Sequence, residues 1–153
     1  MSKLRVRDDD HPEAAGKHLH DASVLLDVFR YDSAAYLSGY VVECALKAVL
    51  LHDKSFDPAT RTHDPATLAD FHRSLARRPY GHDLLTLASV TVSPQNAKYL
   101  IDLPPGSSIF EWRETLRYAG VGFISEPKAR AFCEWAELLY SHSIVTMRQD
   151  GVL

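Results

Sequence analysis

The chain has 153 residues, of which 46% are apolar and 24% are charged, a composition typical of one compact domain with a full core. Its net charge of −3 argues against a protein that holds duplex DNA through many phosphate contacts. No apolar run approaches the ~20 residues of a membrane span, and the charged N-terminus lacks the apolar part of a signal peptide. We expect one cytoplasmic domain over residues 1–153, with residues 1–10 as a flexible tail.

The first helix is expected over residues 11–30, with an apolar stripe that faces the core. Asp10 precedes it as a cap, and Glu13 stands where it would complete a capping box. A tight turn follows, after which Asp32 or Ser33 is expected to cap the next helix. Two long helices joined by so short a turn must be antiparallel.

Residues 33–52 predict the central helix of the domain, because apolar side chains cover nearly its whole circumference. Four polar residues fall within about 60° of one another on this helix. They are Tyr36, Tyr40, Glu43 and Lys47, and we call them the polar seam. A charge withdrawn from water is costly unless it is paired and hydrogen-bonded. The seam is therefore either an internal network built on a Glu43–Lys47 pair or the wall of a site.

Proline and glycine divide the rest of the chain. Residues 53–65 are loop by composition, and the strand-like run at residues 90–92 is too short for a sheet. Helices are expected at residues 66–78, 82–90, 93–103, 107–120 and 126–148. The whole pattern predicts an all-α, antiparallel up-and-down bundle of four to five main helices plus short ones. Residues 11–30 and 126–148 should pack along the central helix.

Three stretches, LLDVFRYD, SAAYLSGYVVECALKAVL and GHDLLTLA, resemble the HEPN domain, a small all-helical module. The resemblance runs from Glu13 to Ala88 at motif level and more generally through Trp112 to Tyr118 and the last helix. It implies the helical bundle but no single activity. HEPN domains include metal-independent ribonucleases, toxins paired with small nucleotidyltransferase antitoxins, and members without demonstrated chemistry.

Arg77 and His82 are the candidate catalytic residues, because ribonuclease members of the family carry an Arg-x(4–6)-His motif. Histidine can act as base and acid in metal-free RNA cleavage, and arginine can stabilise the charged phosphorane. Here Pro79 and Gly81 interrupt the motif. The alternative is structural, with His82 and Asp83 capping a helix and docking it against the seam.

Other chemistry finds little support in the sequence. The histidines show no metal-binding spacing, the glycines form no phosphate loop, and Cys44 and Cys133 occupy apolar helical positions typical of core packing. We expect no cofactor and no metal. The basic cluster of Arg73, Arg77 and Arg78 is either a solvated helix end or a contact for short RNA.

Two functions remain open. The first is a HEPN-like interaction module that binds a nucleotidyltransferase-type partner, or a nucleotide or RNA ligand, at the polar seam with Asp83. The second is a metal-independent ribonuclease toxin of a toxin–antitoxin pair. A homodimer is expected in either case, because the crowded large side chains after residue 111 should leave an apolar patch for a second copy. These side chains are Trp112, Tyr118, Phe123 and Ile124.

Overall fold

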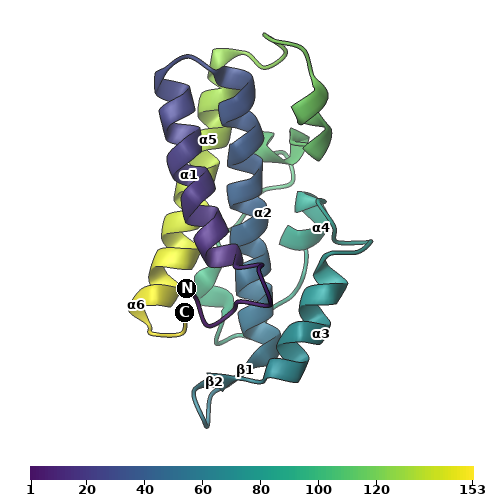
Figure 1. The fold of residues 1–153 in the computed structure, drawn as a ribbon, viewed down its shortest axis with the longest axis vertical. Helices are drawn as coiled ribbons and strands as arrows, with labels where there is room; N and C mark the ends of the chain where they lie inside the picture. Colours follow the sequence, from purple (N-terminus) through teal and green to yellow (C-terminus); the bar gives the residue numbers. More distant parts are fainter.

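A computed structural model describes residues 1–153 as an antiparallel bundle around one central helix. This helix, α2 (Tyr31–Ser55), packs along both α1 (His11–Asp27) and α5 (Glu126–Tyr140) (Figure 1). Every residue from Val41 to His52 is buried, as expected for a helix that is apolar on all sides. The predicted all-α fold and its central helix are confirmed.

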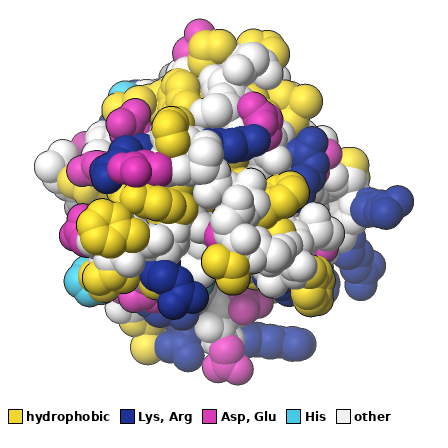
Figure 2. Space-filling view, turned by 90° about the horizontal axis from the view of Figure 1, so that it is seen from above, with side chains coloured by type: hydrophobic (Ala, Val, Ile, Leu, Met, Phe, Trp, Pro, Cys, Tyr) yellow, Lys and Arg dark blue, Asp and Glu magenta, His cyan; other side chains and the backbone are white.

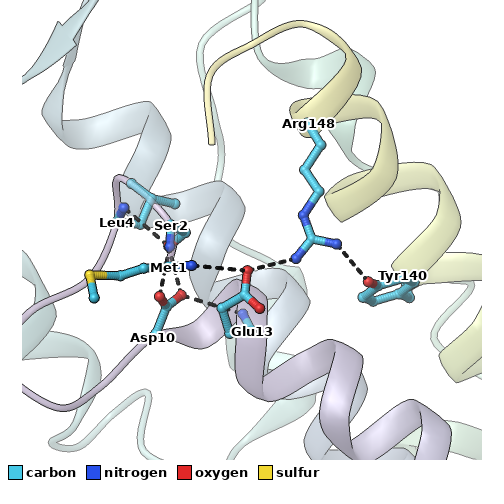
Figure 3. Close-up of polar contacts among 7 residues, drawn as sticks. All are labelled: Met1, Ser2, Leu4, Asp10, Glu13, Tyr140 and Arg148. Atoms are coloured by element: carbon cyan, nitrogen blue, oxygen red, sulfur yellow. Dashed lines mark hydrogen bonds and ion pairs between the residues drawn. The ribbon is translucent and has the colours of Figure 1, made fainter.

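The N-terminal segment packs against the bundle, which differs from the expected flexible tail. Leu4 is only 1% exposed, and the Asp10 carboxylate accepts hydrogen bonds from the backbone N–H and the hydroxyl of Ser2 (Figure 3). Asp10 also caps α1 as predicted, accepting the N–H of Glu13 at 3.3 Å. The Glu13 carboxylate binds the Arg148 guanidinium instead of completing a capping box (Figure 3).

The connection between α1 and α2 is short, as predicted, but its capping differs. Arg30 is the residue before α2, and no side chain caps the helix there. The Asp32 carboxylate instead accepts the N–H groups of Gly122 and Ile124 at 2.7 Å each. A loop amide without a backbone partner needs such an acceptor, so Asp32 ties the loop before α5 to the start of α2.

Beyond α2, the segment expected to be a loop contains a short antiparallel hairpin of β1 (Phe56–Asp57) and β2 (Thr62–His63). Two helices then follow near the predicted places, α3 (Pro65–Leu75) and α4 (Leu84–Ala88). Each begins with an aspartate cap. Asp64 accepts the N–H of Thr67, and Asp83 accepts the N–H of Thr86.

The helices expected at residues 93–103 and 107–120 are absent as α-helices. Only 3₁₀ turns form there, namely η1 (Ala97–Tyr99), η2 (Ser108–Glu111) and η3 (Glu114–Tyr118). Packing of one large side chain explains part of this difference. Trp112, between η2 and η3, is 1% exposed, and its indole N–H donates to the Tyr36 carbonyl at 3.0 Å. A regular helix would have to present this side chain differently.

The last long helix is confirmed, with one irregularity. After Tyr140 the chain continues through a π-helical turn, η4 (Ser141–Val145), into α6 (Thr146–Gln149). Within that turn, Ser143 donates its hydroxyl hydrogen to the Tyr99 carbonyl at 2.6 Å. The turn thereby fastens the long loop between α4 and η2 to the bundle.

Helix α2 is long and apolar enough to cross a membrane by length and composition, although no apolar run in the sequence reaches ~20 residues. However, 83% of its most apolar window is buried inside the bundle. The core helix of a water-exposed bundle meets the same criterion. The buried Cys44 of this helix and the half-buried Cys133 of α5 are both free thiols, in agreement with their predicted packing role.

Candidate functional site

The polar seam lies along one face of α2, as its spacing predicts. Glu43 and Lys47 are 3% and 5% exposed, and the Lys47 Nζ lies 2.7 Å from the Glu43 Oε1. Two charges this far from water need each other, because removing either partner leaves an uncompensated buried charge. The pair forms the inner end of the candidate site.

His82 completes the seam from outside α2. Its Nδ1 lies 2.8 Å from the Glu43 Oε2, and its Nε2 lies 2.8 Å from the Glu114 Oε2 of η3. The ring can donate to both carboxylates only with a proton on each nitrogen. Asp83, the other residue expected at the seam, caps α4 instead. Its cap fixes the start of that helix and thereby places the preceding His82.

The two tyrosines form the outer part of the seam. Their hydroxyls lie 3.3 Å apart, and the Tyr40 ring stands edge-on to the rings of His82 and Trp112 at 5.8 and 5.1 Å. Burial, followed by the contact with Tyr36, raises the pKa of the Tyr40 phenol well above its usual value. Tyr40 is therefore a neutral hydrogen-bonding group at physiological pH.

Arg117 belongs to the same surface, although reading the sequence did not assign it there. Its guanidinium lies 4.8 Å from the centre of the Tyr118 ring, and the side chain lines the same cavity as Tyr36. Tyr118, followed by Tyr36 and Tyr40, raises the pKa of Arg117. Arg117 and Glu114 share one turn of η3, so this turn brings a cation to the tyrosines and a carboxylate to His82. No local pattern reveals the arrangement, because it depends on how η3 packs against α2.

A cavity of about 420 Å³ opens beside this surface. Its wall is formed by the first turn of α2 and by the loop that follows η3. Its polar lining includes Arg30, Ser33, Tyr36, Arg117 and also Asp32, whose carboxylate is held by the N–H groups of the loop. The volume lies in the range of small-molecule sites, and the two arginines suit an anionic ligand.

Helix α1 closes the inner side of the seam with two histidines. Burial lowers the pKa of His11 to about 3, with the Lys47 ammonium as the second cause. Burial also lowers the pKa of His18, whose ring lies 5.7 Å from that of Tyr40. Both histidines are therefore neutral at physiological pH. No group of three side chains from histidine, cysteine, aspartate or glutamate is arranged to hold a metal ion.

Arg77 does not join His82 within the chain. It is exposed beyond the end of α3, where it shares a hollow with Asp9, His72 and Arg73. No hydrogen bond or ion pair connects it to the seam. A turn over Pro79 and Gly81, the latter at φ +43°, separates the two side chains of the expected motif.

Comparison with protein families agrees with this architecture. The HEPN domain family matches residues 9–142, which is most of the chain. The chain belongs to the HEPN family. The resemblance carried by residues 25–50 and 81–88 is thus confirmed, and the polar seam is a feature of a HEPN domain. The chain has no significant match among curated proteins or solved structures.

Proposed function

We propose that this HEPN domain is an interaction module that binds single-stranded RNA or a nucleotide. The binding surface is formed by Tyr36, Tyr40 and Arg117, and we call it the outer seam. Membership of the family supports an RNA-binding or nuclease-type module. One observation carries the proposal: Arg117 lies beside Tyr36 at the wall of a cavity of about 420 Å³. Guanidinium groups bind phosphate through paired hydrogen bonds, and exposed aromatic rings accept stacked bases.

The contacts of His82 favour binding over cleavage. A general base must offer a free nitrogen to the proton that it removes, whereas both nitrogens of His82 face carboxylates at 2.8 Å. The expected partner Arg77 points to another surface. A cleavage reaction would therefore require Glu114 to move and a different cation to stabilise the phosphorane.

The ribonuclease toxin of a toxin–antitoxin pair is the second candidate, and one observation favours it. The His82 side chain is 44% exposed, and Arg117 provides a permanent cation on the same surface. These two residues together would offer the acid–base group and the positive charge that metal-free cleavage needs. Incubation with RNA in EDTA, beside the His82→Ala variant, separates the two candidates.

A homodimer is also part of the proposal. Of the four large side chains expected to form a patch, Trp112 and Ile124 are buried in the core, whereas Tyr118 and Phe123 are exposed. The latter two are among the large side chains that remain exposed at the end of the bundle where α1 meets α2 (Figure 2). The whole patch consists of Val28, Phe29, Tyr118, Val121 and Phe123. We propose that a second copy packs on this patch at the edge of the cavity, of which Phe29 and Val121 line the wall, so that the ligand would bind next to the dimer interface. A small nucleotidyltransferase is the competing occupant. A monomer by light scattering at high micromolar concentration would refute the dimer.

Binding is tested with a fluorescently labelled single-stranded RNA and measured by anisotropy. Arg117→Ala should weaken binding at least about tenfold, since a charged hydrogen-bonded contact contributes about 1.5–3 kcal/mol. Arg61→Ala removes the same charge from the exposed tip of the hairpin and should leave binding unchanged. Equal affinity of the wild type and Arg117→Ala would refute the proposed site.

A further inference from the structure

The C-terminal end of α3 carries a group of arginines that the candidate site does not use. Arg77 and Arg78 are exposed and form no ion pair, whereas Arg73 pairs with Asp70. Arg7 joins them from the N-terminal segment, where it lines the same hollow as Arg73 and Arg77. We call Arg7, Arg73, Arg77 and Arg78 the basic surface.

The basic surface contains hollows as well as positive charges. Two hollows of about 430 and 410 Å³ lie side by side, with Arg73 and Arg77 on the wall of both. Tyr80 lines the first of them, with its ring edge-on to Phe71 at 6.5 Å. Cationic side chains beside an aromatic ring are the composition with which proteins hold single-stranded nucleic acid without reading its sequence.

The local charge is positive although the chain as a whole is acidic. Asp70 is paired with Arg73. Asp9 lies 3.4 Å from His72, a side chain whose pKa is lowered by burial, so the Asp9 carboxylate keeps its negative charge. The three unpaired cations of Arg7, Arg77 and Arg78 outnumber this one charge and are available to an outside anion. A chain of net charge −3 that concentrates unpaired cations in one place directs a polyanion to that place.

The basic surface and the candidate site are joined by a short turn of the chain. Arg78 and His82 are four residues apart, so their Cα atoms are at most about 14 Å apart. Two backbone bonds compact this turn further, from Gly81 to Arg77 and from Asp83 to Tyr80. The connection between α3 and α4 projects from the side of the bundle (Figure 1), so one strand can contact both places.

We propose that the basic surface binds the phosphates of an RNA strand whose neighbouring nucleotides occupy the outer seam. The inference rests on the proposed function and extends it. Arg77 and Arg78 would bind the phosphate backbone of the RNA, and the ligand would be several nucleotides long. The outer seam alone would hold a dinucleotide. The basic surface is needed only when the RNA extends beyond it.

The test compares a labelled dinucleotide with a labelled 12-nucleotide RNA. The double variant Arg77→Gln/Arg78→Gln should bind the 12-mer at least about tenfold more weakly. The slope of log affinity against log salt concentration should become shallower by about 0.7 for each lost phosphate contact. The affinity of the double variant for the dinucleotide should not change. Lys17→Gln/Arg61→Gln removes two exposed charges elsewhere and should match the wild type with both RNAs.

Each other result overturns the inference in a distinguishable way. Unchanged affinity of the double variant for the 12-mer would refute the basic surface and leave the outer seam intact. Weaker binding of both RNAs would place the two arginines in the outer seam itself. Failure of the wild type to bind either RNA would refute the proposed function as well. Binding of a polyglutamate peptide in place of RNA, with the same dependence on Arg77 and Arg78, would identify an acidic protein partner.

Discussion

The Nδ1 of His82 lies 2.8 Å from the Oε2 of Glu43, a carboxylate that is 3% exposed. Lys47 approaches the other oxygen of the same carboxylate at 2.7 Å. The buried charge thus has two donors from different elements, one on α2 and one before α4. Glu43 therefore links the buried Lys47 to the partly exposed His82.

Replacement of Lys47 by methionine should destabilise the domain. The change leaves the buried Glu43 carboxylate with the His82 Nδ1 as its remaining side-chain partner, and breaking a buried pair costs about 3–5 kcal/mol. Because His82 remains, we expect a loss of about 3 kcal/mol in the free energy of unfolding, measured with urea. Lys54→Met, at a half-exposed pair with Asp53, should change stability by less than about 1 kcal/mol. Unchanged stability together with lost RNA binding would make Lys47 a ligand-binding residue.

Gly39 should not tolerate alanine. An added β-carbon would lie 2.1 Å from the Trp112 indole, and the buried indole is held by its hydrogen bond to the Tyr36 carbonyl. We expect Gly39→Ala to cost about 3 kcal/mol through overpacking and to disturb the adjacent tyrosines. Gly106→Ala, with nothing within 4 Å of the added carbon, serves as the control in thermal unfolding. A stable Gly39→Ala protein would show that Trp112 can repack.

The seam illustrates what the sequence could predict. Helical periodicity placed Tyr36, Tyr40, Glu43 and Lys47 on one face, because that relation depends on a single element. Arg117 was missed because its place depends on packing between distant segments. The same reason explains Asp32, whose carboxylate binds a loop about ninety residues later and not its own helix. For residues 107–120, composition suggested a helix, whereas the chain forms two short 3₁₀ turns there and holds Trp112 by its contact with the distant Tyr36 carbonyl.

Acid should destabilise the domain through His52. This side chain is 1% exposed, and burial, followed by the nearby His63, lowers its pKa from 6.5 to about 4. Below pH 6.5 the unfolded chain binds a proton that the folded chain does not, so stability is complete above that pH and decreases as the pH falls towards 4. From about pH 7.5 to about pH 5 the contribution of His52 to the loss should be about 2 kcal/mol, and that of His11, whose pKa is about 3, should be similar. In urea unfolding, His52→Gln should show a correspondingly smaller decrease, and an equal decrease would refute this origin.

Glu114→Gln should increase RNA affinity. Glu114 places a negative charge at the exposed face of His82, where it repels an approaching phosphate and holds the Nε2. Removing the charge should strengthen binding by about twofold to fivefold, within the range of one exposed charge contact. Glu111→Gln removes a charge of the same sign from η2, where it pairs with Lys128, and should have little effect. Weaker binding by Glu114→Gln would instead mean that Glu114 contacts the ligand.

The purified domain should not cleave single-stranded RNA efficiently. Both nitrogens of His82 are engaged, Arg77 lies on another surface, and small displacements at a catalytic site reduce rates by orders of magnitude. The decisive assay is incubation with RNA in EDTA, beside His82→Ala, Arg117→Ala and Arg77→Ala. Cleavage by the wild type that leaves a 2′,3′-cyclic phosphate and disappears in His82→Ala would replace the interaction module with the ribonuclease. Dependence of that cleavage on Arg117 and not on Arg77 would then identify the arginine of the outer seam as the one that stabilises the phosphorane.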